Sequence, residues 1–157
     1  MPPTSTNGVA LDVRAVTGQP LPCPTSASTG ILAPSPMSKV RVGIVGSRFQ
    51  ADCIAGAVKA IPEEAELVAV ASPTKGHAAD FATRHGIPNA YSDYHDLLRD
   101  PKVELISITA PNRLHAQVTI DAAKAGKHVV CEKPLCITLE EADAMIDACA
   151  KAGVLLL

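Results

Sequence analysis

The sequence has few aromatic residues and no excess of charge of either sign. Its 157 residues include no Trp and only two each of Tyr and Phe. Lys plus Arg number 14 against 16 for Asp plus Glu, for a formal net charge of −2. A protein that binds nucleic acid or an anionic membrane surface usually presents a basic field. We therefore expect neither partner, and a small molecule is the expected ligand.

Long hydrophobic runs are also lacking. Hydrophobic residues make up 47% of the chain, but they occur in short runs, and none approaches the ~20 residues of a membrane-spanning helix. The five cysteines form no C-x-x-C pair, and their number is odd in a chain without a secretory signal. We expect a soluble protein of the reducing cytoplasm, with no metal site and with cysteines that act as small buried hydrophobic residues.

The first 37 residues differ from the rest of the chain. Residues 1–36 hold seven of the 13 prolines, are rich in Ser, Thr and Gly, and carry only Asp12 and Arg14 as charges. Such a composition cannot bury enough apolar surface to become ordered. We expect a disordered leader over residues 1–37 and one folded domain over residues 38–157, a length that suffices for a single core.

From Val40 onward, short β-branched runs alternate with stretches of helical periodicity. The runs predict strands at 40–45, 66–71, 103–109 and 127–131, with a weaker strand near Ala90 and Tyr91. They are apolar almost throughout, which is typical of parallel strands that are covered on both faces. The alternation predicts an α/β fold, a doubly wound parallel sheet of the Rossmann type.

The C-terminal part of the sequence carries clear helix-end signals. Thr138 and Glu141 match a capping box at the start of a helix that ends at Gly153. Met145, Ile146 and Cys149 are predicted to form the buried side of this helix. Residues 154–157 then begin another strand. We interpret the end of the sequence inside that strand as a truncation that leaves a C-terminal substrate domain absent.

A glycine-containing loop joins the first predicted strand to the next helix. In a G-x-G-x-x-G/A frame, Gly46 makes the tight turn and Ala51 allows close packing of the helix, whose free N–H groups would bind a pyrophosphate. Arg48 stands in place of the middle glycine. Either its guanidinium contacts phosphate oxygens, or it is a solvated arginine beside a loop that binds nucleotide weakly. The candidate phosphate-binding residues are Gly46, Ser47, Arg48, Phe49 and Gln50.

The second predicted strand ends without the acidic residue that an NAD-preferring domain places against the ribose hydroxyls. Ser72, Thr74 and Lys75 stand there instead. Two hydroxyls and an ammonium would suit a 2′-phosphate, so we expect an NAD(P) cofactor with NADP favoured over NAD. The alternative is that Ser72 or Thr74 caps the following helix while Lys75 is a surface charge.

Two further motifs stand at the carboxyl ends of predicted strands, where open α/β sheets bind their ligands. The sequence TAPNRLH follows the strand at 103–109, and CEKP follows the strand at 127–131. A lysine that is partly desolvated beside a nicotinamide can lose its proton more readily than a surface lysine and can serve in acid–base chemistry. Lys133 is therefore the candidate catalytic residue.

The order VGIVG, ITAPNRLH and AGKHVVCEKPL resembles the N-terminal NAD(P)-binding domain of the Gfo/Idh/MocA oxidoreductases over about residues 39–157. The EKP element, at its distance after P-N-x-x-H, is the most specific part of the resemblance. The resemblance implies that Lys133 contacts the reacting hydroxyl of the substrate and aids proton transfer. It also implies that the nicotinamide side of the cleft is lined by Pro111, Asn112, His115 and Glu132. Taken singly, Lys133 could be an exposed lysine, His115 a helix-face histidine and Asn112 a helix N-cap.

Three residues depart from the family pattern and bear on cofactor choice and affinity. Arg48 replaces the middle glycine, Ser72 the common acid, and Ile54 a frequent histidine. The resemblance implies a complete enzyme that moves a hydride to or from the carbinol carbon of a sugar or polyol. The resemblance also implies a second domain that supplies substrate contacts and usually the oligomer interface. Without that domain, this chain is expected to bind nucleotide without turnover and is not expected to oligomerise. The alternatives are a non-catalytic NAD(P)-binding module and an inactive gene fragment.

Overall fold

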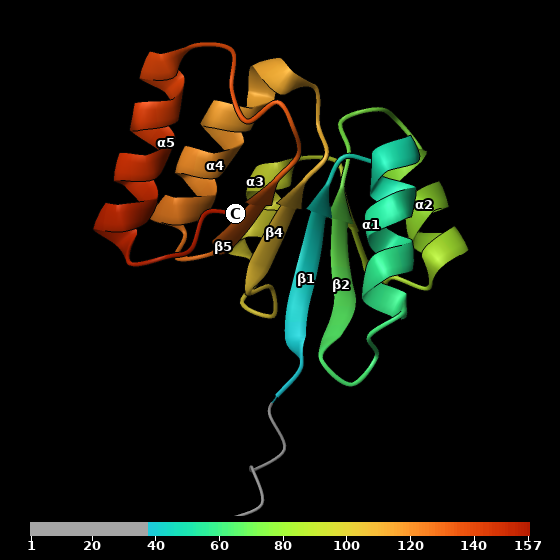
Figure 1. Cartoon of the computed structure of the whole chain (residues 1–157). Coiled ribbons are helices and arrows are strands. Elements are labelled where there is room, and N and C mark those ends of the chain that lie inside the picture. The colour runs from blue at the N-terminus through green and yellow to red at the C-terminus, as the bar shows by residue number, and fades with distance from the viewer. Residues whose placement is uncertain (1–37) are drawn as a thin grey trace, which may run out of the picture. The chain divides into compact units, whose positions relative to one another are not determined.

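Five parallel strands form a sheet at the centre of residues 38–157, the part of the chain that the computed structural model describes. The leader expected at residues 1–37 lies outside the described residues. The strands pair in the order β3-β2-β1-β4-β5, so the order reverses between β1 and β4 (Figure 1). Their bounds are β1 (Val40–Val45), β2 (Ala65–Ala71), β3 (Asn89–Tyr91), β4 (Leu105–Ile108) and β5 (His128–Cys131).

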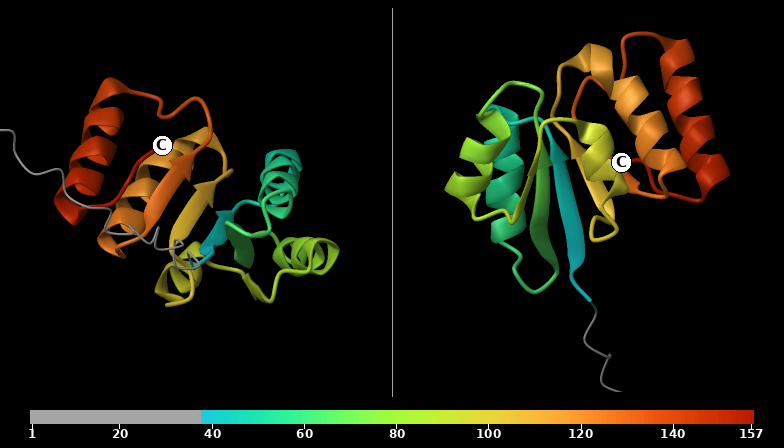
Figure 2. Two further views of the ribbon diagram at one scale, coloured as in Figure 1. Left: turned by 60° about the horizontal axis from the view of Figure 1, so that its bottom comes forward. Right: turned by 180° about the vertical axis from the view of Figure 1, so that it is seen from behind.

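Helices cover both faces of this sheet (Figure 2). They are α1 (Phe49–Lys59), α2 (His77–His85), α3 (Tyr94–Arg99), α4 (His115–Lys124) and α5 (Leu139–Ala152), with a short 3-10 turn η1 (Asn112–Leu114) before α4. One hydrophobic cluster joins Ile44 and Val70 to Phe81 of α2 and to Ala51 and Ala55 of α1. The other joins Val45 to Leu97 of α3 and Val118 of α4. The predicted α/β fold, a doubly wound parallel sheet, is confirmed.

The four strong strands were predicted to within two residues at each end. The largest difference is at the start of β4, where residues 103 and 104 belong to the preceding turn. The Val103 N–H donates to the Asp100 carbonyl oxygen at 3.2 Å. The ammonium of Lys127 is buried beneath this turn and donates to the Asp100 and Val103 carbonyl oxygens at 3.0 and 2.7 Å. Burial lowers the pKa of Lys127.

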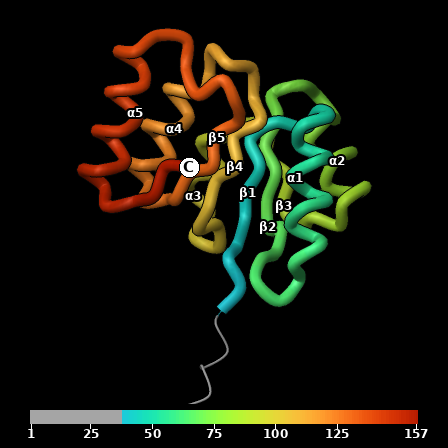
Figure 3. The backbone as a smooth tube through the Cα atoms, viewed as in Figure 1, coloured from blue at the N-terminus to red at the C-terminus, as the bar shows by residue number. Residues whose placement is uncertain are grey.

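The last four residues run alongside β5, on the side opposite β4 (Figure 3). The Val129 N–H donates to the Leu155 carbonyl oxygen at 2.9 Å, and the Leu157 N–H donates to the Val129 carbonyl oxygen at 3.0 Å. Leu156 packs against the cluster beneath α4, whereas Leu155 and Leu157 are 61% and 69% exposed. The segment thus adds a parallel bridge to the sheet.

The predicted capping box at the start of α5 is confirmed. The Thr138 hydroxyl accepts from the Glu141 N–H at 3.2 Å, and the Glu141 carboxylate accepts from the Thr138 N–H at 3.4 Å. Met145 is buried as expected, but the prediction for Ile146 is wrong, since its side chain is 54% exposed. α5 packs mainly against α4 rather than on the sheet. A helix with one helical neighbour buries a narrower stripe than a helix on a sheet.

The four described cysteines differ in burial. Cys149 is buried, but Cys53 is exposed, so the expectation of buried cysteines is wrong there. Within residues 38–157, no group of three or more metal-ligating side chains is close enough together to hold a metal ion. None of the described helices has the length and apolar character needed to cross a membrane.

Candidate functional site

A cavity of about 860 Å³ opens at the carboxyl ends of the strands. Its walls come from the loops that follow β1, β2, β3 and β4, at residues 46–48, 72–74, 92–94 and 109–111, together with His77 and Arg113. This is the edge of the sheet at which open α/β folds bind ligands, because the loops diverge where the strand order reverses. The cavity therefore lies where the sequence predicted the cofactor.

Gly46 forms the tight turn at the base of the cavity. Its φ is +120°, which side chains of L-residues rarely permit, and its N–H donates to the Ala71 carbonyl oxygen at 2.9 Å. A Cβ added to Gly46 would lie 2.8 Å from the carbonyl oxygen of Thr109. The turn after β1 and the end of β4 thus approach more closely than any residue with a side chain allows.

The helix that follows, α1, begins without a side-chain cap. Arg48 occupies the N-cap position with extended backbone and makes no side-chain cap hydrogen bond. The first N–H groups of α1 therefore remain available to an anion at the cavity edge, where the helix dipole also favours negative charge. The Arg48 side chain is exposed and lines the cavity, while the Ser47 hydroxyl donates to the Ser72 hydroxyl oxygen at 3.0 Å.

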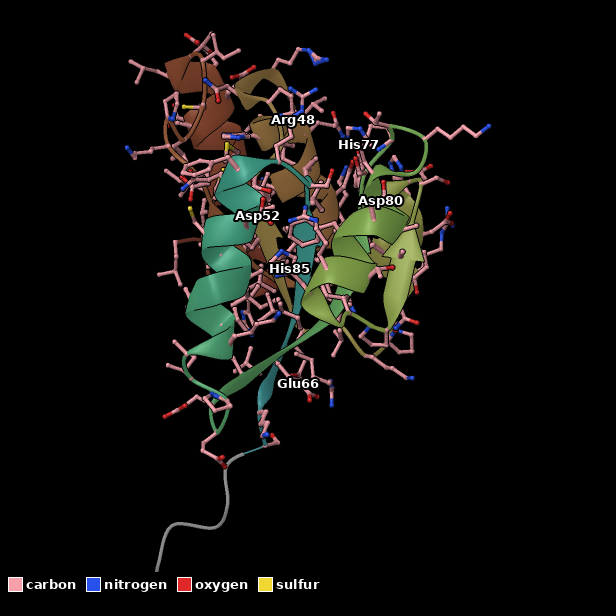
Figure 4. The ribbon with its side chains drawn as sticks, turned by 90° about the vertical axis from the view of Figure 1, so that its right-hand side faces the viewer. Arg48, Asp52, Glu66, His77, Asp80 and His85 are labelled. Carbon is pink, nitrogen blue, oxygen red and sulfur yellow. The ribbon has the colours of Figure 1, made fainter. Side chains whose placement is uncertain are left out.

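The loop after β2 presents polar groups to the same cavity. Ser72 is only 6% exposed, and Thr74 and His77 also line the wall, whereas Lys75 is exposed outside it. The alternative in which Ser72 or Thr74 caps the next helix is wrong, since the N-cap of α2 is Gly76 and no side-chain hydrogen bond caps it. Arg48 and His77 lie toward this end of the molecule, and Glu66 lies at the opposite end (Figure 4).

The loop after β3 contributes a carboxylate that the sequence did not single out. Asp93 caps α3 and lines the cavity, and its Oδ1 accepts from the His95 N–H at 2.9 Å and lies 2.7 Å from the His95 ring. The backbone hydrogen bond from His95, followed by the ring contact, lowers the pKa of Asp93, so its carboxylate is charged at neutral pH. Beside it, burial and a hydrogen bond to Asp121 raise the pKa of Tyr94 to about 12.

A second group of candidate residues surrounds the segment after β5. The Glu132 N–H donates to the Ile108 carbonyl oxygen at 3.0 Å, which extends the pairing with β4. The Glu132 carboxylate accepts a hydrogen bond from the Gln50 amide at 2.8 Å. Lys133 itself is exposed, and its peptide bond to Pro134 is cis. Burial raises the pKa of the preceding Cys131 to about 11, so this thiol stays protonated at neutral pH.

His115 lies beneath this segment rather than in the cavity. Its ring is 1% exposed, with Nε2 2.9 Å from the Ala110 carbonyl oxygen and Nδ1 3.0 Å from the Pro134 carbonyl oxygen. The ring therefore connects the loop after β4 to the loop after β5. Asn112 opens the 3-10 turn η1 and is exposed, and the N-cap position there belongs to Pro111, which lines the cavity.

In a comparison with models of protein families, the family described as "Oxidoreductase family, NAD-binding Rossmann fold" matches residues 40–157. The chain belongs to the Gfo/Idh/MocA family of oxidoreductases. It is 38% identical over 121 residues to levoglucosan dehydrogenase of Pseudarthrobacter phenanthrenivorans, covering 71% of this chain and 30% of the relative. It is 43% identical over 94 residues to D-xylose 1-dehydrogenase (NADP(+)) 2 of Haloferax volcanii, covering 60% and 29%.

Solved structures agree with this family. The WlbA dehydrogenase from Bordetella pertussis, in complex with NADH and UDP-GlcNAcA, superposes with a TM-score of 0.73 at 30% identity, covering 76% of this chain and 36% of that one. The chain thus spans about a third of the length of the relatives that it matches. The part it spans is the NAD-binding domain of the Gfo/Idh/MocA oxidoreductases.

The predicted site residues of this family member fall into three sets. The cavity wall contains Gly46, Ser47, Arg48, Ser72 and Pro111. The contacts around Lys133 involve Gln50, Glu132 and His115. Phe49, Lys75 and Asn112 are exposed outside the cavity.

Among the wall residues that the sequence did not single out, three carry charged or imidazole side chains: His77, Asp93 and Arg113. Arg113 lies within the P-N-x-x-H motif, and Asp93 carries the local signature of a helix N-cap. Those signals indicate turns and helix starts. They do not reveal whether a residue lines a cavity, because that depends on how the loops fold. The residues present fit a dinucleotide, since an uncapped helix start, a glycine turn without room for a Cβ, and two arginines meet at one cavity.

Proposed function

We propose that this chain is the nucleotide-binding part of an NAD(P)-dependent oxidoreductase that acts on the carbinol carbon of a sugar or polyol. The observation that carries the proposal is the cavity at the end of β1, which is lined by Gly46, by Arg48 at the uncapped start of α1, and by Arg113. These groups bind phosphate oxygens through backbone N–H donors and guanidinium charges. Relatives named for sugar substrates support the substrate class.

In the complete enzyme, a bound nicotinamide would supply or accept the hydride. This chain's own residues would hold the cofactor and handle the proton. The pyrophosphate would rest on the first N–H groups of α1, with Arg48 turned onto it in place of the missing middle glycine. Lys133, exposed at the carboxyl end of β5, would hydrogen-bond the substrate hydroxyl and take or return its proton. The proposal assigns the substrate contacts to a second domain, so residues 38–157 alone should bind nucleotide without measurable turnover.

Nucleotide titration tests the cofactor site. We expect NADPH fluorescence to report saturable binding to the chain, and Arg48→Ala to weaken it about tenfold, the cost of one hydrogen bond from a charged group. Arg99→Ala is the matched control, because Arg99 is an exposed arginine at the end of α3 that pairs with Asp96 and lies outside the cavity. Equal affinities for Arg48→Ala and Arg99→Ala would remove Arg48 from the site.

We further propose that the site prefers NADP to NAD. Ser72 and Thr74 line the wall after β2, His77 stands beside them, and Lys75 is on the same loop. Hydroxyl donors with positive charge suit a 2′-phosphate. One observation favours NAD instead, namely the charged carboxylate of Asp93 on the same wall, which would repel a phosphate and accept from ribose hydroxyls.

Comparing NADPH with NADH decides between these cofactors. The preference for NADP requires that NADPH binds several-fold tighter than NADH, and that Asp93→Asn widens this ratio by removing the opposing charge. Equal affinity for the two nucleotides in the unmodified chain would refute the roles given to Ser72, Thr74 and Lys75. A preference for NADH that Asp93→Asn abolishes would establish NAD as the cofactor and Asp93 as its ribose acceptor.

We also propose a cytoplasmic location and a monomeric state for the chain as it stands. The four described cysteines are all free thiols, which suits a reducing compartment. Sedimentation at several protein concentrations tests the monomer, and a mass that stays at the dimer value on dilution would overturn it.

A further inference from the structure

The three-residue segment that contains Lys133 is connected to helices on both faces of the sheet. Its first member, Glu132, accepts a hydrogen bond from Gln50 in the first turn of α1. Its last member, Pro134, contacts the His115 ring at the start of α4 through its carbonyl oxygen. α1 packs on one hydrophobic cluster of the sheet, and α4 packs on the other. The residue between these two contacts is the proposed proton-transfer lysine.

The hydrogen bond between Gln50 and Glu132 joins residues 82 positions apart in the sequence. An amide N–H that donates to a carboxylate forms a stronger hydrogen bond than one between two neutral groups. The main chain of Glu132 is also held, since its N–H donates to the carbonyl oxygen of Ile108 on β4. Both the side chain and the backbone of the residue before Lys133 are therefore fixed.

His115 fixes the residue after Lys133 by a different route. At 1% exposure its ring is shielded from water, and each ring nitrogen lies within 3.0 Å of a carbonyl oxygen, that of Ala110 or that of Pro134, to which a ring N–H can donate. A buried ring nitrogen without a partner would cost the free energy of its lost hydration. The ring therefore holds the loop after β5 at a set distance from the loop after β4.

We propose that Gln50 and His115 are positioning residues for Lys133, and that neither acts as a ligand of the cofactor. Neither side chain lines the cavity, although both stand within motifs that predict cofactor contacts. Each acts on the residue next to Lys133, so that the lysine backbone is held from α1 on one side and from α4 on the other. The inference rests on the proposed function for the role of Lys133, but the contacts themselves can be tested without nucleotide.

Swapping the amide and the carboxylate between positions 50 and 132 tests the role of Gln50. Gln50→Glu places two carboxylates against each other, and we expect amide hydrogen exchange at residues 132–136 to quicken several-fold. Adding Glu132→Gln restores an amide-to-carboxylate pair, so the double variant should recover the protection. Gln117→Glu is the matched control, because Gln117 also donates to a carboxylate, that of Asp121 on α4, at 2.9 Å. This control should leave residues 132–136 unchanged.

NADPH affinity separates positioning from cofactor binding. A positioning role predicts that Gln50→Met, which removes the amide without adding a charge at the start of α1, changes NADPH affinity by less than about threefold while exchange at residues 132–136 rises. A loss as large as that of Arg48→Ala, with exchange unaltered, would make Gln50 a cofactor ligand and overturn the proposal. If the unmodified chain binds neither NADPH nor NADH, the proposed function fails, but the exchange data still decide whether Gln50 and Glu132 are coupled.

His115 needs a measurement that does not depend on a variant that may unfold. Nitrogen NMR of the unmodified chain should show at least one ring N–H of His115 in slow exchange with water, hydrogen-bonded to a carbonyl oxygen. His115→Gln keeps a donor at this site and should retain more protection at residues 132–136 than His115→Phe. A ring whose protons exchange as fast as those of exposed His77 would contradict the proposal.

Discussion

Replacing Lys127 by Met should strongly destabilise the domain. Its ammonium donates hydrogen bonds to the Asp100 and Val103 carbonyl oxygens, and Lys127 is only 9% exposed. Hydrogen bonds from charged groups contribute about 1.5 to 3 kcal/mol each, and part of this is offset because the variant no longer buries a charge. Methionine has a similar length and fills the space. We expect the free energy of unfolding to fall by about 2 to 3 kcal/mol.

Urea denaturation followed by circular dichroism measures this loss. With a slope of about 1 to 3 kcal/mol per molar urea for a domain of this size, the midpoint should fall by about 1 M. Lys124→Met is the matched control, since Lys124 is 71% exposed and 3.9 Å from Asp121, and it should change stability by less than about 0.5 kcal/mol. Equal midpoints for Lys127→Met and Lys124→Met would refute the view that the buried ammonium holds the turn before β4.

The pH dependence of the difference in unfolding free energy between the unmodified protein and Lys127→Met is a further check. Burial lowers the pKa of Lys127 in the folded chain below its value of 10.5 in the unfolded chain. Between these two values the unfolded chain binds more protons, so the stability of the unmodified protein rises with pH relative to that of Lys127→Met. The gap between the two proteins should therefore widen as the pH approaches 10.5, and a gap that narrows would contradict the sign of the shift.

Two further predictions concern the turn before α1 and α1 itself. Gly46→Ala should lower stability by about 2 kcal/mol and NADPH affinity more than tenfold, because its φ of +120° and the nearby Thr109 carbonyl oxygen leave no room for a Cβ. Thermal unfolding and nucleotide titration measure both effects, and unaltered binding would exclude a role for the turn. Asp52 faces His85 of α2 at 2.7 Å (Figure 4), and hydrogen bonds from His85 and Arg84 lower the pKa of Asp52. Asp52→Asn should cost less than about 1 kcal/mol at neutral pH. The difference should disappear as the pH falls below 3.8 and through the folded pKa, whereas a loss that persists in acid would point to packing.

The fold could be predicted from the sequence wherever its cause is local. The capping box of Thr138 and Glu141 is confirmed because its donors and acceptors lie within one helical turn. The apolar runs located the strands because β1, β2 and β4 are buried along most of their length. The Ile146 prediction failed because α5 has one helical neighbour, and no periodicity within a helix reveals how many neighbours it has.

The candidate site was less accessible, because its contacts join distant parts of the chain. The motif positions indicated that His115 and Gln50 belong near the site. Their partners, the Pro134 carbonyl oxygen and the Glu132 carboxylate, lie 19 and 82 residues away. Whether a residue faces the cavity or supports its wall depends on the path of these loops. Asp93 was missed for the same reason, because its capping of α3 indicates a helix start and says nothing of the cavity beside it.

The central strand β1 contributes adjacent side chains to both hydrophobic clusters, Ile44 to one and Val45 to the other. Both layers of helices pack on β1, so a movement of this strand disrupts the packing of both layers at once. The domain should therefore unfold in a single cooperative transition rather than one face at a time. Tyr91 and Tyr94 pack against one cluster only, yet their fluorescence should follow the melting of both.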